Sequence, residues 1–198
     1  MSIWKGSAGH WIRYRCGLAP ADTQTTEAER ECLARHARGR RSLVELGVMH
    51  GVNTALLRSV MADDGVVTGI DPHPPGRLFV SFERLVARRE VERQRRGRAV
   101  LRRQFSHDAA IGWNSPIDFL FVDGDHSWNG IERDWRDWTP HIVPGGVVAL
   151  HDSLGVSHRP DLDSVRFTRE VIAHDSRFRV IDVVETVTVL ERIAAPSP

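Results

Sequence analysis

The sequence lacks several features that mark particular classes of protein. Among 198 residues there are only two cysteines, Cys16 and Cys32, and their spacing is not that of a metal-binding pair. A chain so poor in cysteine does not rely on a disulfide framework, and this favours a compartment where thiols stay reduced. We therefore expect a cytoplasmic protein.

Long apolar runs and a strong net charge are also absent. No apolar run approaches the roughly 20 residues that a membrane span needs, and residues 1–15 lack the apolar centre of a secretion signal. The formal net charge is +1, so the composition as a whole does not indicate binding to nucleic acid or to an anionic membrane. We expect neither as a partner.

What the chain does have is a repeating alternation of short apolar runs and segments with helical periodicity. Strands are expected at 42–46, 66–70, 99–101, 117–122 and 147–150, and helices at about 25–37, 53–61, 80–95, 128–138 and 164–173. Only Glu185 separates the β-rich runs 178–184 and 186–190, which predicts a tight antiparallel pair. The pattern predicts an α/β fold: a Rossmann-like, mostly parallel seven-stranded sheet with helices on both faces and an antiparallel last strand.

Right-handed crossovers place the turns that follow parallel strands at one edge of the sheet. That edge is expected to hold residues 45–53, 71–73, 123–126 and 151–152. Polar, glycine-rich turns at the carboxyl ends of strands are where open α/β sheets bind ligands. The sequence therefore predicts a ligand site there.

The turn after the first strand reads ELGVMHGVNT over residues 45–54. Its glycines, Gly47 and Gly51, are spaced G-x-x-x-G, which is neither a dinucleotide fingerprint nor a Walker loop. Asp71 ends the next strand, where a carboxylate can accept hydrogen bonds from both hydroxyls of a ribose. The alternative is that the glycines merely make a turn and Asp71 caps the next segment.

The apolar strand 117–122 ends in Asp123, Asp125 and His126, and the fifth strand ends in His151 and Asp152. Like charges placed close together are costly, so a divalent cation or a positively charged ligand is expected between these strand ends. Oxygen ligands from Asp123 and Asp152 suit Mg²⁺, and a nitrogen from His151 would also suit Mn²⁺, Fe²⁺ or Zn²⁺. The alternatives are that Asp125 only bonds its turn, that His126 faces solvent and that His151 is a packing residue.

Together these motifs resemble those of class I S-adenosylmethionine-dependent methyltransferases, in which an acid lies two residues before the first glycine of the turn. The pattern Asp-Gly-Asp-His, then Pro-Gly-Gly and His-Asp, more narrowly resembles small-molecule O-methyltransferases of the cephalosporin-hydroxylase-like and macrolide sugar methyltransferase group. The resemblance runs from about Thr25 to Asp152.

This resemblance implies S-adenosylmethionine as the cofactor, with Asp71 at its ribose and Ser106 and His107 near its adenine. The residues implied at its amino-acid end are Glu45, Gly47, Val48, Gly51 and Thr54.

At the reaction centre the resemblance implies Asp123 beside the cofactor and, with Asp152, as a ligand of Mg²⁺ or another divalent cation. His151 is implied as a third ligand or a residue behind the ligands, and His126 as the general base. Metal-dependent catechol-type relatives usually pair Asp with Asn on the fifth strand, and here the pair is His-Asp.

The activity to expect is O-methylation of a hydroxyl on a small metabolite, such as a sugar or aromatic unit of a natural product in secondary metabolism. One alternative is RNA methylation through residues 83–104, which hold nine arginines and three glutamates. That stretch is equally typical of a solvated helix whose arginine stems cover Leu85 and Val91. Another alternative is a non-catalytic nucleotide- or partner-binding domain.

We expect one methyltransferase domain over residues 23–193, a leader or lid at 1–22 and a tail at 194–198. The leader carries a basic and aromatic cluster, which predicts either a lid over the acceptor pocket or a contact within a homo-oligomer. The cluster consists of Trp4, His10, Trp11, Arg13 and Tyr14.

Overall fold

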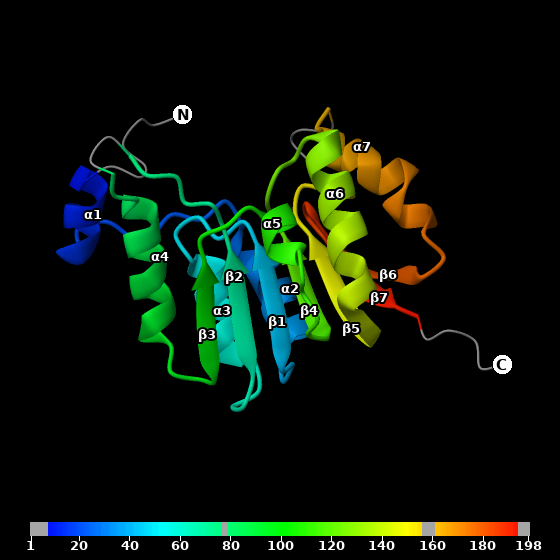
Figure 1. Ribbon diagram of the computed structural model, residues 1–198, viewed down its shortest axis with the longest axis horizontal. Helices are drawn as coiled ribbons and strands as arrows, with labels where there is room; N and C mark the ends of the chain where they lie inside the picture. Colours follow the sequence, from blue (N-terminus) through cyan, green and yellow to red (C-terminus); the bar gives the residue numbers. More distant parts are fainter. Residues whose placement is uncertain (1–7, 77–78, 156–160, 194–198) are drawn as a thin grey trace.

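The computed structural model describes residues 8–76, 79–155 and 161–193, and it shows one mixed sheet between two layers of helices (Figure 1). The strand order is β3-β2-β1-β4-β5-β7-β6. The strands are β1 (Ser42–Leu46), β2 (Val66–Ile70), β3 (Arg98–Arg102), β4 (Ile117–Val122), β5 (Ile142–Leu150), β6 (Phe178–Val184) and β7 (Val187–Arg192).

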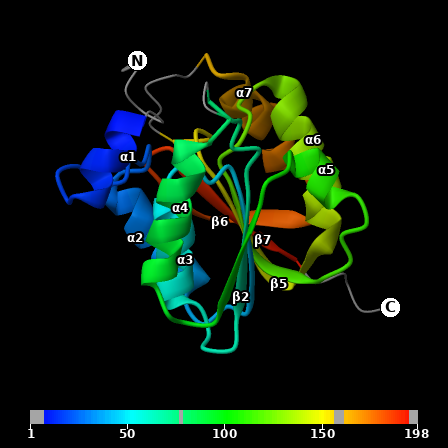
Figure 2. The same ribbon diagram turned by 60° about the vertical axis from the view of Figure 1, so that its left-hand side comes forward.

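Helices cover both faces of this sheet. Figure 2 shows α2, α3 and α4 on one side and α5, α6 and α7 on the other. Their bounds are α1 (Ala8–Arg15), α2 (Glu27–Ala37), α3 (Val52–Val60), α4 (Phe82–Arg93), α5 (Ser106–Ala110), α6 (Trp128–Trp138) and α7 (Asp163–Glu170), with short 3₁₀ turns at Thr139–His141 and Ile172–His174.

The sheet confirms the predicted fold. Strands β1 to β5 pair in parallel, β7 runs antiparallel to β5, and β6 runs antiparallel to β7. Glu185, with φ of 51°, makes the tight turn between β6 and β7. β5 begins at Ile142, earlier than the expected 147, because the strand passes through a register shift in which Gly145 adopts φ of 75°.

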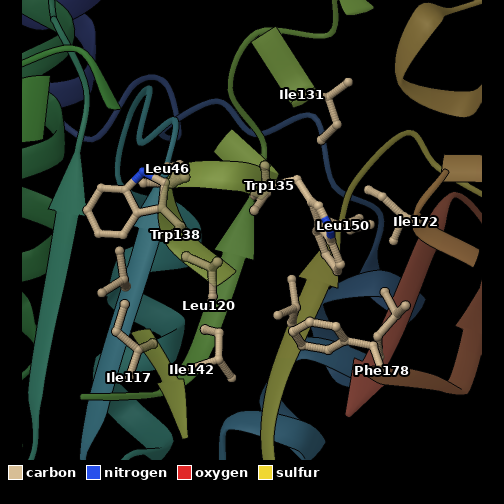
Figure 3. Packing of buried hydrophobic residues seen from close by; sticks show 14 of the residues in the cluster. Leu46, Ile117, Leu120, Ile131, Trp135, Trp138, Ile142, Leu150, Ile172 and Phe178 are labelled. Atoms are coloured by element: carbon tan, nitrogen blue, oxygen red, sulfur yellow. The ribbon is translucent and has the colours of Figure 1, made fainter. Parts of the chain in front are cut away.

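The apolar core lies on both faces of β4, whose side chains alternate between them. Leu120 points into the cluster under α6 and α7, whereas Phe119 and Phe121 point into the cluster under α2 and α3. Trp135 and Trp138 of α6 lie in the first cluster, as Figure 3 shows. Both tryptophans therefore belong to the core.

The arginine-rich helix α4 packs through Val86, Ala87 and Val91, and Leu85 is only half-buried. Leu85 therefore contributes less to the buried face than expected. Two arginines of α4 form surface ion pairs, Arg88 with Glu92 and Arg93 with Glu90.

Helix α1, in the predicted leader, packs against α4. Tyr14 is buried there, and its hydroxyl donates a hydrogen bond to Glu90 Oε1 at 2.6 Å. Trp4 of the predicted cluster and the tail 194–198 lie outside the described residues. Within the described part of the chain, no helix is long and apolar enough to cross a membrane.

Candidate functional site

A cavity of about 750 Å³ opens at the carboxyl edge of the parallel strands, where the sequence predicts a ligand site. Its volume lies within the range of roughly 300–1,000 Å³ that is usual for small-molecule sites. The turns after β1, β2 and β4 and the start of α5 form its wall, and residues 22–24 and part of α6 complete it. Asp22, the last residue of the predicted leader, thus reaches the cavity, whereas α1 packs on α4.

Gly47 allows the turn after β1 to pass close to the end of β4. Its φ is 87°, and a Cβ at this position would lie 2.6 Å from the carbonyl carbon of Asp123. Only glycine fits such a conformation and such an approach. Val48 follows on the cavity wall.

Asp71 joins the first two turns. Its Oδ2 accepts hydrogen bonds from the backbone N–H groups of Val48 and Met49, both at 2.9 Å, and its Oδ1 accepts one from His73 N–H at 2.7 Å. The carboxylate also lines the cavity. It therefore holds the glycine turn in shape and still lines the cavity.

Three residues predicted to contact the amino-acid end of the cofactor lie behind the cavity wall. They are Glu45, Gly51 and Thr54. Glu45 is fully buried and accepts a hydrogen bond from Thr54 Oγ1. Burial raises the pKa of Glu45 well above its usual range, against the lowering effect of Thr54. Gly51 permits close packing of α3 on α4, since a Cβ there would lie 2.9 Å from the backbone of Ala87. That these three residues contact the cofactor stays a prediction.

On the opposite wall Ser106 begins α5 and donates a hydrogen bond through Oγ to Asp134 Oδ1 at 2.5 Å. Asp134 is only 3% exposed, yet it lines the cavity together with Ser106 and His107. Burial raises the pKa of Asp134 to about 6, and the charge of Asp125 adds to this while the Ser106 hydrogen bond opposes it. Sequence reasoning missed Asp134, although an acid next to the apolar stripe of α6 is a visible signal.

The ends of β4 and β5 bring Asp123, His126, His151 and Asp152 together, as neighbouring parallel strands should. Nε2 of His126 lies 3.8 Å from Asp123 Oδ1 and 3.9 Å from Asp152 Oδ2. The His126 side chain is 30% exposed and lines the cavity. Oδ1 of Asp125, by contrast, accepts a hydrogen bond from Ser127 N–H at 3.0 Å, so this carboxylate bonds its own turn.

His151 is buried between carboxylates. Its Nδ1 lies 3.0 Å from Asp123 Oδ1 and 3.8 Å from Asp152 Oδ2, and its Nε2 lies 3.5 Å from Glu29 Oε2. Burial lowers the pKa of His151, but Asp123 and Glu29 more than offset this and raise it to about 10. The ring is therefore an imidazolium when no other cation is present.

Glu29 is the member of this cluster that sequence reasoning missed. Burial raises the pKa of Glu29, but hydrogen bonds with His151, Thr186 and Thr26 outweigh it and lower the value to about 2. In the sequence, Thr26-x-x-Glu29 signals only a helix capping box, which α2 indeed has. The contact with His151 joins segments that are far apart in the chain.

The donor set fits a divalent cation. Nδ1 of His151 is a buried atom without a hydrogen bond of good geometry, and it faces Asp123 Oδ1. Its 3.0 Å separation from that oxygen matches the edge of about 3.0 Å expected between neighbouring ligands of an octahedral cation with bonds near 2.1 Å. Ligand atoms of Asp123, His126 and His151 lie within 4.8 Å of one another. Binding would require His151 to release its proton.

Residues 44–153 match a family model described as a methyltransferase domain. Among curated proteins, an uncharacterized protein of Sinorhizobium fredii (strain NBRC 101917 / NGR234), y4gI, is 26% identical over 126 residues. This match covers 60% of the present chain and only 14% of that protein.

Solved structures share the fold at low identity. A Corynebacterium glutamicum protein has a TM-score of 0.69 at 17% identity, with 96% of this chain and 92% of that chain covered. A Bacillus cereus O-methyltransferase in complex with S-adenosylhomocysteine has a TM-score of 0.65 at 18% identity, with 92% and 87% covered. The Streptomyces achromogenes O-methyltransferase TomG, involved in tomaymycin synthesis and solved with S-adenosylmethionine, has a TM-score of 0.65 at 17% identity, with 98% and 92% covered.

Proposed function

The chain belongs to the methyltransferase-domain family, and on this basis we propose that it transfers a methyl group from S-adenosylmethionine to a hydroxyl oxygen of a small acceptor, with a divalent cation at the site. The observation that carries the proposal is one cavity with the Gly47 turn and Asp71 on one wall and Asp123 and His126 on another. Residues 23–193 would form the catalytic domain, with 1–22 as its leader.

The cofactor would lie along the turns after β1 and β2. When bound, it supplies a methyl group on a positively charged sulfonium. The Gly47–Val48 backbone would face its amino-acid end, and Ser106 and Asp134 would lie toward its adenine. A carboxylate has about four acceptor positions, and three backbone donors already bond Asp71. We therefore propose that Asp71 accepts a hydrogen bond from one ribose hydroxyl and not from both.

Asp123 and Asp152 would hold the cation through oxygen, and His151 through Nδ1. A cation held there lowers the pKa of an acceptor hydroxyl and orients its oxygen. Magnesium suits the two carboxylates, and a nitrogen ligand favours a first-row transition metal such as Mn²⁺.

His126 is the proposed general base, since it lies on the cavity wall beside Asp123 and Asp152. Carboxylates at 3.8 and 3.9 Å can stabilise the positive charge that the ring gains when it takes a proton. The remaining task of the protein is to align the acceptor oxygen with the methyl group, because the transfer is an in-line displacement.

The acceptor is proposed to be a small hydroxylated molecule, such as a sugar or aromatic unit of a natural product. RNA is not favoured, because among the described residues none of those lining the cavity comes from the arginine-rich helix α4. The arginines at its carboxyl end are also partly neutralised, as in the pair of Arg93 with Glu90 at 2.5 Å.

Two measurements test the proposal. Calorimetry of the full chain should detect binding of S-adenosylhomocysteine, and the absence of binding would refute the cofactor assignment. Transfer of a labelled methyl group should then be measured on a panel of sugar and phenolic hydroxyls, with His126→Gln and Asp123→Asn. Both variants should lose at least about 100-fold in rate. Activity that survives exhaustive chelation would reject the cation and spare the methyltransferase assignment.

A further inference from the structure

We infer that Glu29 is a positioning residue for His151: its carboxylate accepts the Nε2–H of the ring, so that Nδ1 is turned toward Asp123 and the cation site. The cation is part of the proposed function, and the inference rests on it to that extent. Residue 29 lies outside the segment 44–153 that matches the family model.

Glu29 is held far more firmly than a helix cap requires. It is 1% exposed, and its Oε2 accepts a hydrogen bond from Thr26 N–H at 2.9 Å, which completes the capping box of α2. Its Oε1 accepts two more, from Thr186 N–H at 3.0 Å and from Thr186 Oγ1 at 2.6 Å. A carboxylate bound from two distant segments has little freedom to move.

Oε2 of Glu29 also faces the ring of His151. Oε2 lies 3.5 Å from Nε2, whereas Nδ1 on the other side of the ring lies 3.0 Å from Asp123 Oδ1. A neutral imidazole carries one proton, and a cation bound at Nδ1 leaves that proton on Nε2, beside the Glu29 carboxylate. The lone pair is then on Nδ1, the atom that a cation beside Asp123 needs.

This arrangement matches a general property of metal sites. A histidine ligand usually donates its other N–H to a carboxylate or carbonyl, which sets the tautomer and makes the ligand more basic. Glu29 has this position relative to the His151 ring, on the side opposite to Asp123.

The test compares Mn²⁺ affinity in the full-length chain and in Glu29→Gln, measured from the electron paramagnetic resonance signal of free Mn²⁺. Loss of the outer carboxylate should raise the dissociation constant by roughly 10- to 100-fold. Glu31→Gln, an exposed residue of the same helix, removes the same charge and should leave the affinity unchanged. Thr26→Ala removes the hydroxyl that caps α2 and leaves the Glu29 carboxylate in place, so it should also bind Mn²⁺ normally. Equal affinity in wild type and Glu29→Gln would overturn the inference.

A second measurement does not depend on the metal. Nitrogen-15 spectra of the histidine rings, assigned with His151→Gln, should show an exchange-protected Nε2–H for His151 that disappears in Glu29→Gln. If the wild type binds no Mn²⁺ but this signal behaves as expected, the cation proposal fails and the positioning role of Glu29 stands. A signal that is unchanged in Glu29→Gln refutes the positioning role. If Glu29→Gln fails to fold, Thr186→Val replaces it, because it removes one hydrogen-bond donor to Glu29. This variant must weaken both Mn²⁺ binding and the exchange protection of the His151 Nε2–H. If neither changes in Thr186→Val, the inference is refuted.

Discussion

Substitution of Gly47 by alanine should both destabilise the fold and displace Asp123 from the cavity. A Cβ at Gly47 would lie 2.6 Å from the carbonyl carbon of Asp123, and two carbon atoms normally approach to about 3.5–4.0 Å. One of the two turns must therefore move by about 1 Å. Because the turn after β4 carries Asp123, that movement reaches the reaction centre directly.

The loss of stability expected for Gly47→Ala has two parts, which a control variant can separate. An alanine in a left-handed conformation costs about 1–2 kcal/mol, and forcing a methyl group into a packed region adds about 1–3 kcal/mol. Gly39 has φ of 72°, close to the 87° of Gly47, but a Cβ there would meet no atom within 4 Å. Gly39→Ala should therefore show only the backbone part, about 1–2 kcal/mol, and Gly47→Ala about 2–5 kcal/mol.

Urea denaturation followed by circular dichroism measures both values, and calorimetry measures the affinity for S-adenosylhomocysteine. A displacement of about 1 Å can cost about 100-fold at a site that depends on positioning, so we expect Gly47→Ala to weaken binding at least tenfold while Gly39→Ala binds normally. If the two variants were equally stable and bound S-adenosylhomocysteine equally well, the role given to the close approach of the turns after β1 and β4 would be wrong.

Three further predictions concern the core, the buried charges and the thiols. Trp138 is fully buried, so Trp138→Ala should lower the free energy of unfolding by about 3–5 kcal/mol in urea denaturation; a loss below about 1 kcal/mol would contradict its place in the core. The pKa of His151 is raised from 6.5 to about 10, so its stabilising contribution is complete below pH 6.5 and is lost as pH rises toward 10. The stability difference between wild type and His151→Gln should shrink over that range, and a constant difference would refute the imidazolium assignment. Burial raises the pKa of the Cys32 thiol to about 11, whereas Cys16 is exposed; a thiol reagent should label Cys16 alone in the folded protein, and rapid labelling of both would contradict the packing of α2.

The elements of the fold could be predicted because local patterns carry them. The alternation of apolar strands with helical stretches placed β1, β2 and β4 within a residue or two, and Glu185 marked the turn between β6 and β7. The start of β5 could not be predicted, because Pro144-Gly145-Gly146 reads as a turn. Its pairing with β4 depends on a register shift that only the neighbouring strand reveals.

The site was predictable only where a residue ends a strand. Parallel strands bring their carboxyl ends to one edge, so Asp71, Asp123 and His151 were expected at the same edge once the strands were recognised. The same logic does not tell which side chains face the cavity. Gly51 packs against Ala87 of α4, and Glu45 lies buried beneath the turn, where Thr54 bonds it.

The sequence by itself determined the sheet edge, the glycine turn and the acids and imidazoles at the strand ends, because each belongs to a short segment whose periodicity and turn residues act locally. The tertiary structure alone decided the partners of those groups. Glu29 meets His151 because α2 and the turn between β6 and β7 pack beside the end of β5, and Asp134 faces the cavity because α6 turns it toward Ser106. Such contacts depend on distances between segments far apart in the chain, and no local pattern encodes them.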